Sequence, residues 1–126
     1  MKVLIVGDEP SKQTDPKVTF KGAACEKRLM QWIKDLGITE YELINRTHPD
    51  FDLIRFRYRW GWNMPIIALG NNASKALGPY YDHFKLPHPS GRNRKINNKQ
   101  YLVSILNECR LYLRTFVENN DNCLDR

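Results

Sequence analysis

Short apolar runs alternate along this chain with segments in which apolar residues recur every three or four positions. The runs at 3–6, 41–44 and 64–69 have the length of strands, and 83–86 predicts a short fourth strand. Helical spacing predicts helices over 23–36, 51–60 and 73–77 and a long amphipathic helix over 97–118. Strands that alternate with helices are typical of a parallel sheet covered on both faces. The pattern therefore predicts an α/β fold: a three-layer αβα sandwich with a mostly parallel four-stranded sheet.

The segment 51–60 also fits a strand, because aromatic and aliphatic residues alternate there with Arg55, Arg57 and Arg59. Arginines interleaved with aromatic rings can stack on bases or hold phosphates. A covering helix whose arginine stems lie over apolar surface explains the same pattern. We interpret the segment as a covering helix.

Composition limits the chain to one domain, which we place at 1–118, followed by a polar tail at 119–126. Of the 126 residues, 41% are hydrophobic, and the net charge of +6 favours a polyanionic partner without requiring one. The cysteines, Cys25, Cys109 and Cys123, are too widely spaced for a disulfide framework, a zinc site or an iron–sulfur cluster. No run predicts a signal peptide or a membrane span. We expect a soluble intracellular monomer with no membrane partner.

Three polar loops follow predicted strands, at 7–20, 45–49 and 88–94. Parallel sheets usually bind their ligands at the carboxyl ends of the strands. The third loop combines His88 with two prolines, Gly91 and two arginines, although a simple connecting loop would have a similar composition. Asn71 or Asn72 is expected to cap the helix at 73–77, whose amide groups could hold a phosphate.

Five short motifs occur in these loops and turns: Gly7-Asp8-Glu9-Pro10, the Phe20, Gly22 and Ala24 of Thr19–Ala24, Asn45 after the second strand, Leu69-Gly70-Asn71, and His88-Pro89-Ser90. In this order they resemble the motifs of the uracil-DNA glycosylase superfamily. The similarity extends from residue 3 to about residue 94. The chain is most similar to the branch with a Gly-Glu-Ala-Pro-Gly first motif, but it lacks the four iron–sulfur cysteines of that branch. It is also shorter than most members, as in a minimal enzyme encoded by a virus or phage.

The resemblance implies a DNA glycosylase that flips uracil out of single- or double-stranded DNA and hydrolyses its N-glycosidic bond, with no metal or other cofactor. His88 would donate to the uracil oxygen that becomes negative. Asp8 or Glu9 would orient the attacking water, and we favour Asp8. Phe20 would stack on the base, and Asn45 would read its edge. The other implied residues are Gly7, Pro10 and Ser11 in the base pocket, and Lys12, Asn71, Ser90, Gly91, Arg92, Asn93 and Arg94 on DNA, with Arg92 as a wedge.

Two other functions fit the same residues. A DNA-binding accessory protein of this fold would bind DNA without releasing a base. A glycosylase for another modified base is also possible, because Ser11 stands where some branches carry an aromatic residue that excludes the thymine methyl group.

Overall fold

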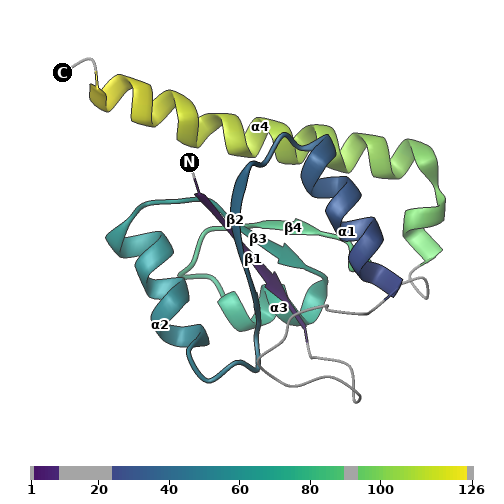
Figure 1. The fold of residues 1–126 in the computed structure, drawn as a ribbon, viewed down its shortest axis with the longest axis horizontal. Helices are drawn as coiled ribbons and strands as arrows, with labels where there is room; N and C mark the ends of the chain where they lie inside the picture. The colour runs from purple at the N-terminus through teal and green to yellow at the C-terminus, as the bar shows by residue number, and fades with distance from the viewer. Residues whose placement is uncertain (1, 9–23, 90–93, 125–126) are drawn as a thin grey trace.

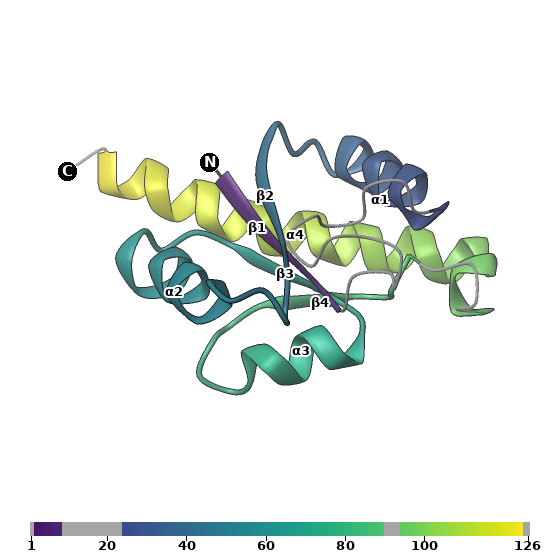
Figure 2. The ribbon, with the colours of Figure 1, turned by 60° about the horizontal axis from the view of Figure 1, so that its bottom comes forward.

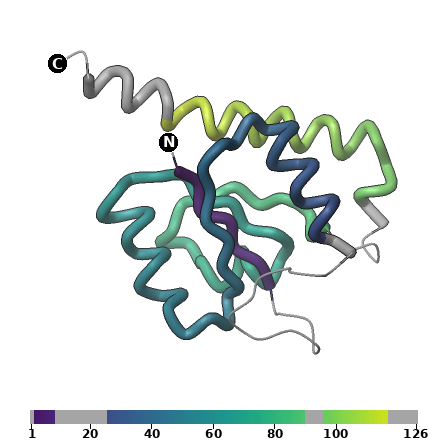
Figure 3. Tube along the Cα trace, in the orientation of Figure 1, coloured from purple at the N-terminus to yellow at the C-terminus, as the bar shows by residue number. Residues whose placement is uncertain are grey.

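The apolar run at the start of the chain forms the central strand of the sheet. In a computed structural model, which describes residues 2–8, 24–89 and 94–124 and the side chains of residues 2–8, 26–89 and 96–116, β1 spans Lys2–Gly7 and buries every residue after Lys2. It lies between β2 (Glu40–Asn45) and β3 (Ile66–Leu69), and β4 (Phe84–Leu86) pairs with β3. All pairings are parallel, in the order β2-β1-β3-β4. The predicted four-stranded parallel sheet is confirmed, and Figure 3 shows β1 passing through its middle.

Helices cover both faces of the sheet, as predicted (Figures 1 and 2). One core joins alternate residues of β1 and β3 to α1 (Ala24–Asp35) and α4 (Lys99–Leu124). The other core joins the remaining β1 and β3 residues to α2 (Phe51–Phe56) and α3 (Asn71–Leu77). Because successive side chains of a strand point to opposite faces, each strand buried on both sides supplies both cores.

The segment predicted as a covering helix is helical but changes its winding. After α2, a π-helical turn, η1, spans Arg57–Gly61, and its wider turn is closed by the backbone N–H of Trp62 on the carbonyl of Arg57 at 2.7 Å. Tyr58 is fully buried there and donates to the Glu42 carboxylate at 2.8 Å. Burial, followed by this hydrogen bond, raises the pKa of the Tyr58 phenol.

Several predicted boundaries move. Strand β3 begins at Ile66, after Pro65, which has no N–H to donate to a neighbouring strand. A 3-10 turn, η2, spans Arg94–Asn97 before α4 begins. Helix α4 continues to Leu124, so most of the predicted polar tail belongs to this helix. In the part of the chain that the structure describes, no helix combines the length and apolar character of a membrane span.

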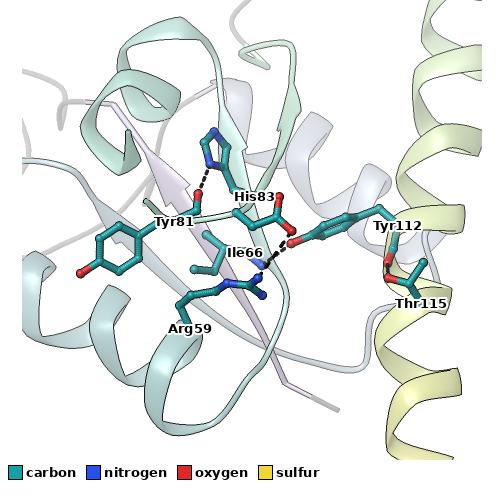
Figure 4. Close-up of polar contacts among 7 residues, drawn as sticks. Arg59, Ile66, Tyr81, His83, Tyr112 and Thr115 are labelled. Atoms are coloured by element: carbon teal, nitrogen blue, oxygen red, sulfur yellow. Dashed lines mark hydrogen bonds and ion pairs between the residues drawn. The ribbon is translucent and has the colours of Figure 1, made fainter. Parts of the chain in front are cut away.

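Polar contacts at the amino ends of β3 and β4 hold the layers together (Figure 4). The backbone N–H of Ile66 donates to the Tyr112 hydroxyl of α4 at 3.2 Å. Arg59 of η1 forms an ion pair with Asp82 at 3.7 Å, just before β4. Burial raises the pKa of the Tyr112 phenol to about 12, so its hydroxyl stays protonated at neutral pH. We call this end of the sheet the amino edge.

His83 links α3 to the start of β4 at the same edge. Its Nδ1 lies 2.6 Å from the Tyr81 carbonyl oxygen, and its Nε2 lies 2.7 Å from the Ser74 hydroxyl. A carbonyl oxygen can only accept, so Nδ1 carries a proton, and Nε2 shares a second hydrogen bond with the Ser74 hydroxyl. Both ring nitrogens are therefore satisfied within the fold.

Candidate functional site

The parallel sheet brings all four strand ends to one place, which we call the carboxyl edge. Gly7 of β1 is in register with Asn45 of β2, and Leu69 of β3 is in register with Leu86 of β4. The residues that follow, including Asp8, Arg46, Gly70 and His88, therefore leave the sheet at the same edge. The described starts of the three polar loops therefore lie at one edge of the sheet.

Asn45 is the one fully buried polar side chain among the described residues, with 1% of its surface exposed. Its backbone carbonyl accepts from the N–H of His48 at 3.0 Å, but its side-chain Nδ2 has no hydrogen-bond partner there. A buried amide without a partner costs about 1–3 kcal/mol. Such a group in a folded protein needs an explanation, and an absent ligand is one.

Asp8 is held by two side chains, one directly after β2 and one in the first turn of α3. Arg46 Nε lies 2.6 Å from Asp8 Oδ1, and Asn72 Nδ2 donates to Asp8 Oδ2 at 3.0 Å. Burial raises the pKa of the Asp8 carboxyl, but the hydrogen bonds from Asn72 and Arg46, with the charges of Arg46 and His88, outweigh it. The net pKa lies below the ordinary 3.8. Asp8 is therefore a fixed carboxylate at neutral pH.

His88 is half-buried and lies against the turn after β3. A Cβ atom placed on Gly70, whose φ is +92°, would lie 3.2 Å from the Cβ of His88, so glycine serves both the turn and the close approach. Burial lowers the pKa of the His88 ring, and the nearby Asp8 charge raises it in part. The net shift is downward, so His88 is neutral at pH 7 and can donate one N–H.

The loop after β4 is also tied to α1. Arg28 Nη1 donates to the carbonyl of Pro89 at 2.6 Å, and both Pro87 and Pro89 are buried. The prolines fix the backbone on each side of His88, as the sequence predicts. The residue after His88 is thus held by α1, and His88 itself lies against the turn after β3.

The predicted cap of α3 is wrong. Gly70 occupies the N-cap position, and no side chain caps the helix. Asn71 and Asn72 lie inside the first turn, where Asn71 accepts from Lys85 at 3.0 Å and Asn72 binds Asp8. The positive φ of Gly70 turns the chain one residue earlier than predicted, which aims both asparagines at neighbouring strands.

The structure brings five of the predicted site residues to the carboxyl edge: Gly7, Asp8, Asn45, Asn71 and His88. The Asn71 side chain accepts a hydrogen bond from Lys85 there. Arg94 begins η2, and its side chain is outside the description. The remaining predictions lie outside the described residues: Glu9, Pro10, Ser11, Lys12, Phe20, Ser90, Gly91, Arg92 and Asn93.

Three contacts at this edge were not predicted from the sequence, those of Arg46, Asn72 and Arg28. Arg46 directly follows Asn45, and Asn72 directly follows Asn71, so their position after a strand was a usable signal. No group of three or more histidine, cysteine or acidic side chains within the described residues could hold a metal ion.

Comparison with protein-family models, with curated proteins and with solved structures finds no match for this chain. The family resemblance therefore stays a prediction. The site geometry must carry any functional argument.

Proposed function

We propose that this chain is a monofunctional DNA glycosylase that hydrolyses the N-glycosidic bond of uracil, or of a related modified base, in DNA. The observation that carries the proposal is the Asn45 amide, which is buried at the carboxyl edge and whose Nδ2 has no partner among the described residues. The order of motifs in the sequence is its second support.

Asn45 has the right groups to read one edge of uracil. Uracil presents an acceptor at O4 and a donor at N3, which match the Nδ2 donor and the Oδ1 acceptor of an asparagine side chain. Cytosine presents a donor in place of O4, and it would leave the Asn45 amide without a partner. A buried site built for one hydrogen-bonding pattern rejects a ligand that leaves its polar groups unpaired.

His88 and Asp8 supply the two electrostatic roles that cleavage needs. As the glycosidic bond breaks, negative charge develops on the base and positive charge on the sugar. A neutral His88 donates an N–H to the base oxygen that gains charge. The Asp8 carboxylate, ionised and held by Arg46 and Asn72, stabilises the sugar and orients the attacking water.

The carboxyl edge also carries cations suited to a polyanion. Arg28, Arg46 and Lys85 lie around it, and the chain has a net charge of +6. Lysine and arginine side chains near a reading site position nucleic acid through its phosphates without specifying sequence. This charge supports DNA as the polymer that carries the base.

The test is release of uracil from a single-stranded oligonucleotide, read as strand cleavage after alkali treatment. We expect cleavage by the natural chain and much slower cleavage by Asn45→Ala and His88→Ala. His83→Ala is the matched histidine control, because His83 lies at the opposite edge and is satisfied by Ser74 and Tyr81. Full activity in both site variants would contradict the assignment.

A chain that binds DNA in a salt-dependent manner but releases no base from a panel of modified oligonucleotides would instead support the accessory protein. The hydrogen bonds from Arg46 and Asn72 to Asp8 favour this second function, because a carboxylate that accepts hydrogen bonds at both oxygens is a weaker base. The same panel distinguishes uracil from other modified bases.

A further inference from the structure

Two hydrogen bonds fix the backbone on either side of His88. Before it, the carbonyl of Leu86, the last residue of β4, accepts from the backbone N–H of Gly70 at 2.8 Å. After it, the carbonyl of Pro89 accepts from Nη1 of Arg28 at 2.6 Å. The two donors come from opposite faces of the sheet, because Gly70 starts α3 and Arg28 belongs to α1. The short stretch that carries His88 is therefore anchored at both ends.

The loop cannot supply the second anchor with its own amides. Proline has no backbone N–H, so neither Pro87 nor Pro89 can donate to a neighbouring strand. Pro89 is buried, and a buried carbonyl needs a donor. The donor is a guanidinium on a long side chain, which belongs to a helix residue 61 positions earlier in the chain.

Helix α1 gives Arg28 a firm base. Leu29, Trp32 and Ile33 of this helix are buried in the core that joins it to β1 and β3. Arg28 itself is partly buried, and within the described part of the chain it forms no ion pair. Its contact with the loop is therefore not a by-product of a charge pair elsewhere.

We propose that Arg28 is a positioning residue, which holds His88 in place at the carboxyl edge through the Pro89 carbonyl. This inference rests on the proposed function, in which the His88 ring donates to the departing base. Such a donor works only when its N–H already points at the oxygen that gains charge. A misplacement of about 1 Å can slow a reaction about a hundredfold. Arg28 thus contributes to cleavage without touching the base.

The first test follows the titration of the His88 ring by NMR and needs no activity. Arg28→Met removes the donor but keeps a long side chain that suits a helix. Without its anchor the ring should become more exposed to water. Burial is the larger influence on the pKa of this ring and the Asp8 charge the smaller one, so loss of both raises the midpoint toward the ordinary 6.5.

Charge and position are separated by a control and by salt. Lys27→Met removes the same charge from an exposed position on the same helix, and it should leave the His88 midpoint unchanged. The rise in Arg28→Met should persist at high salt, which screens the effect of a lost charge but does not alter burial. An unchanged midpoint, equal rises in both variants, or a rise that disappears at high salt would overturn the proposal.

The second test is the kinetics of uracil release. Arg28→Met should lower kcat about tenfold or more, with KM changed no more than in Lys27→Met. A direct contact between Arg28 and a DNA phosphate predicts the opposite pattern: KM rises, kcat stays the same, and DNA binding depends less on salt. That pattern would overturn the proposal. So would a variant that unfolds more easily but keeps its kcat, because Arg28 would then serve only the fold.

Failure of this inference is distinguishable from failure of the proposed function. If the natural chain releases no base from any modified oligonucleotide, the proposed function fails, and the NMR titration still decides whether Arg28 places His88. If the natural chain releases uracil and Arg28→Met matches it in kcat and in the His88 midpoint, only the role of Arg28 is refuted.

Discussion

The amino edge and the carboxyl edge of the sheet each carry a histidine with an acidic side chain nearby. A hydroxyl group accompanies the histidine at the amino edge and an amide at the carboxyl edge, but the two edges use these groups differently. At the amino edge, His83 has both ring nitrogens within hydrogen-bond distance of partners, and the hydroxyl of Tyr112 receives a backbone N–H. At the carboxyl edge, His88 is kept neutral by burial, and the Asn45 amide has no partner among the described residues.

This difference separates polar groups that hold the fold together from the Asn45 amide, which is available to a ligand. Buried polar atoms in folded proteins nearly always have hydrogen-bond partners. A satisfied group is sufficiently explained by the fold, whereas an unsatisfied one costs stability and needs a further reason. Removing a side chain should therefore affect stability at the amino edge and activity at the carboxyl edge.

The largest effect is expected at Asn45. Asn45→Leu keeps the volume but removes both hydrogen-bonding groups, so uracil release should fall about 10³-fold. The free energy of unfolding should stay equal or rise, because an unpaired buried amide has been replaced by an apolar group. Single-turnover cleavage and chemical denaturation measure the two quantities. A variant that unfolds more easily and cleaves normally would show that Asn45 serves the fold.

His88→Ala should slow release about 10²-fold, since it removes one donor to the departing base.

The pH at which the His88 ring becomes charged should reflect the downward shift of its pKa. Because its pKa lies below the ordinary 6.5, the neutral ring persists on acidification through pH 6.5 and is lost only below it. Asp8→Asn removes the charge that raises this pKa, so the ring should titrate at a still lower pH. Titration of the His88 ring by NMR measures both midpoints, and an unchanged or higher midpoint in Asp8→Asn would contradict the coupling.

Arg46→Ala should reduce activity about tenfold, a smaller effect because Asn72 still holds Asp8. Loss of the Arg46 hydrogen bond and charge raises the pKa of the Asp8 carboxyl. The stability and activity that depend on the ionised Asp8 carboxylate are present above this pKa. On acidification, Arg46→Ala should therefore lose them at a higher pH than the natural chain does. The pH profile of cleavage measures this shift, with Arg114→Ala on the exposed surface of α4 as the matched arginine control. Equal profiles for both variants would remove Arg46 from the site.

The smallest effect is expected at the amino edge. His83→Ala leaves Ser74 and the Tyr81 carbonyl without their shared partner, which should lower the free energy of unfolding by about 1 kcal/mol. Uracil release should be unchanged at a temperature where both proteins are folded. Thermal unfolding and the cleavage assay together check this, and a loss of activity in a fully folded His83→Ala would show that the amino edge takes part in the function.

Most of the fold could be predicted from the sequence because its signals are local. The run Val3 to Val6 is apolar throughout and becomes the central strand, and the helical spacing of Leu29 and Ile33 places α1 on one face. The change to a π-helical turn at Arg57 could not be predicted, because both winding types place Tyr58 and Trp60 on different sides. The position of Gly70 at the start of α3 was missed for a similar reason, since asparagine is the commoner cap.

The location of the candidate site could be predicted from the sequence, but the contacts among its side chains could not. The strand ends located Asp8, Asn45 and His88 at one edge. The hold of Arg46 and Asn72 on Asp8 depends on the strand order, which puts β1 between β2 and β3. Nothing in the spacing of residues 8, 46 and 72 along the chain reveals which strands are neighbours.

The central place of β1 also shapes how the chain can fold as it is synthesised. Strand β1 is synthesised before both of its neighbours: it needs β2 on one side and β3 on the other, and β3 in turn needs β4, whose last residue is Leu86. Until then, one side of the growing sheet presents unpaired backbone groups that can pair with another nascent chain. The face covered by α4 stays open longer still, because this helix begins only at Lys99. Folding to the native state therefore has to wait until α4 has been made, and a truncation before α4 should yield an aggregating protein rather than a smaller domain.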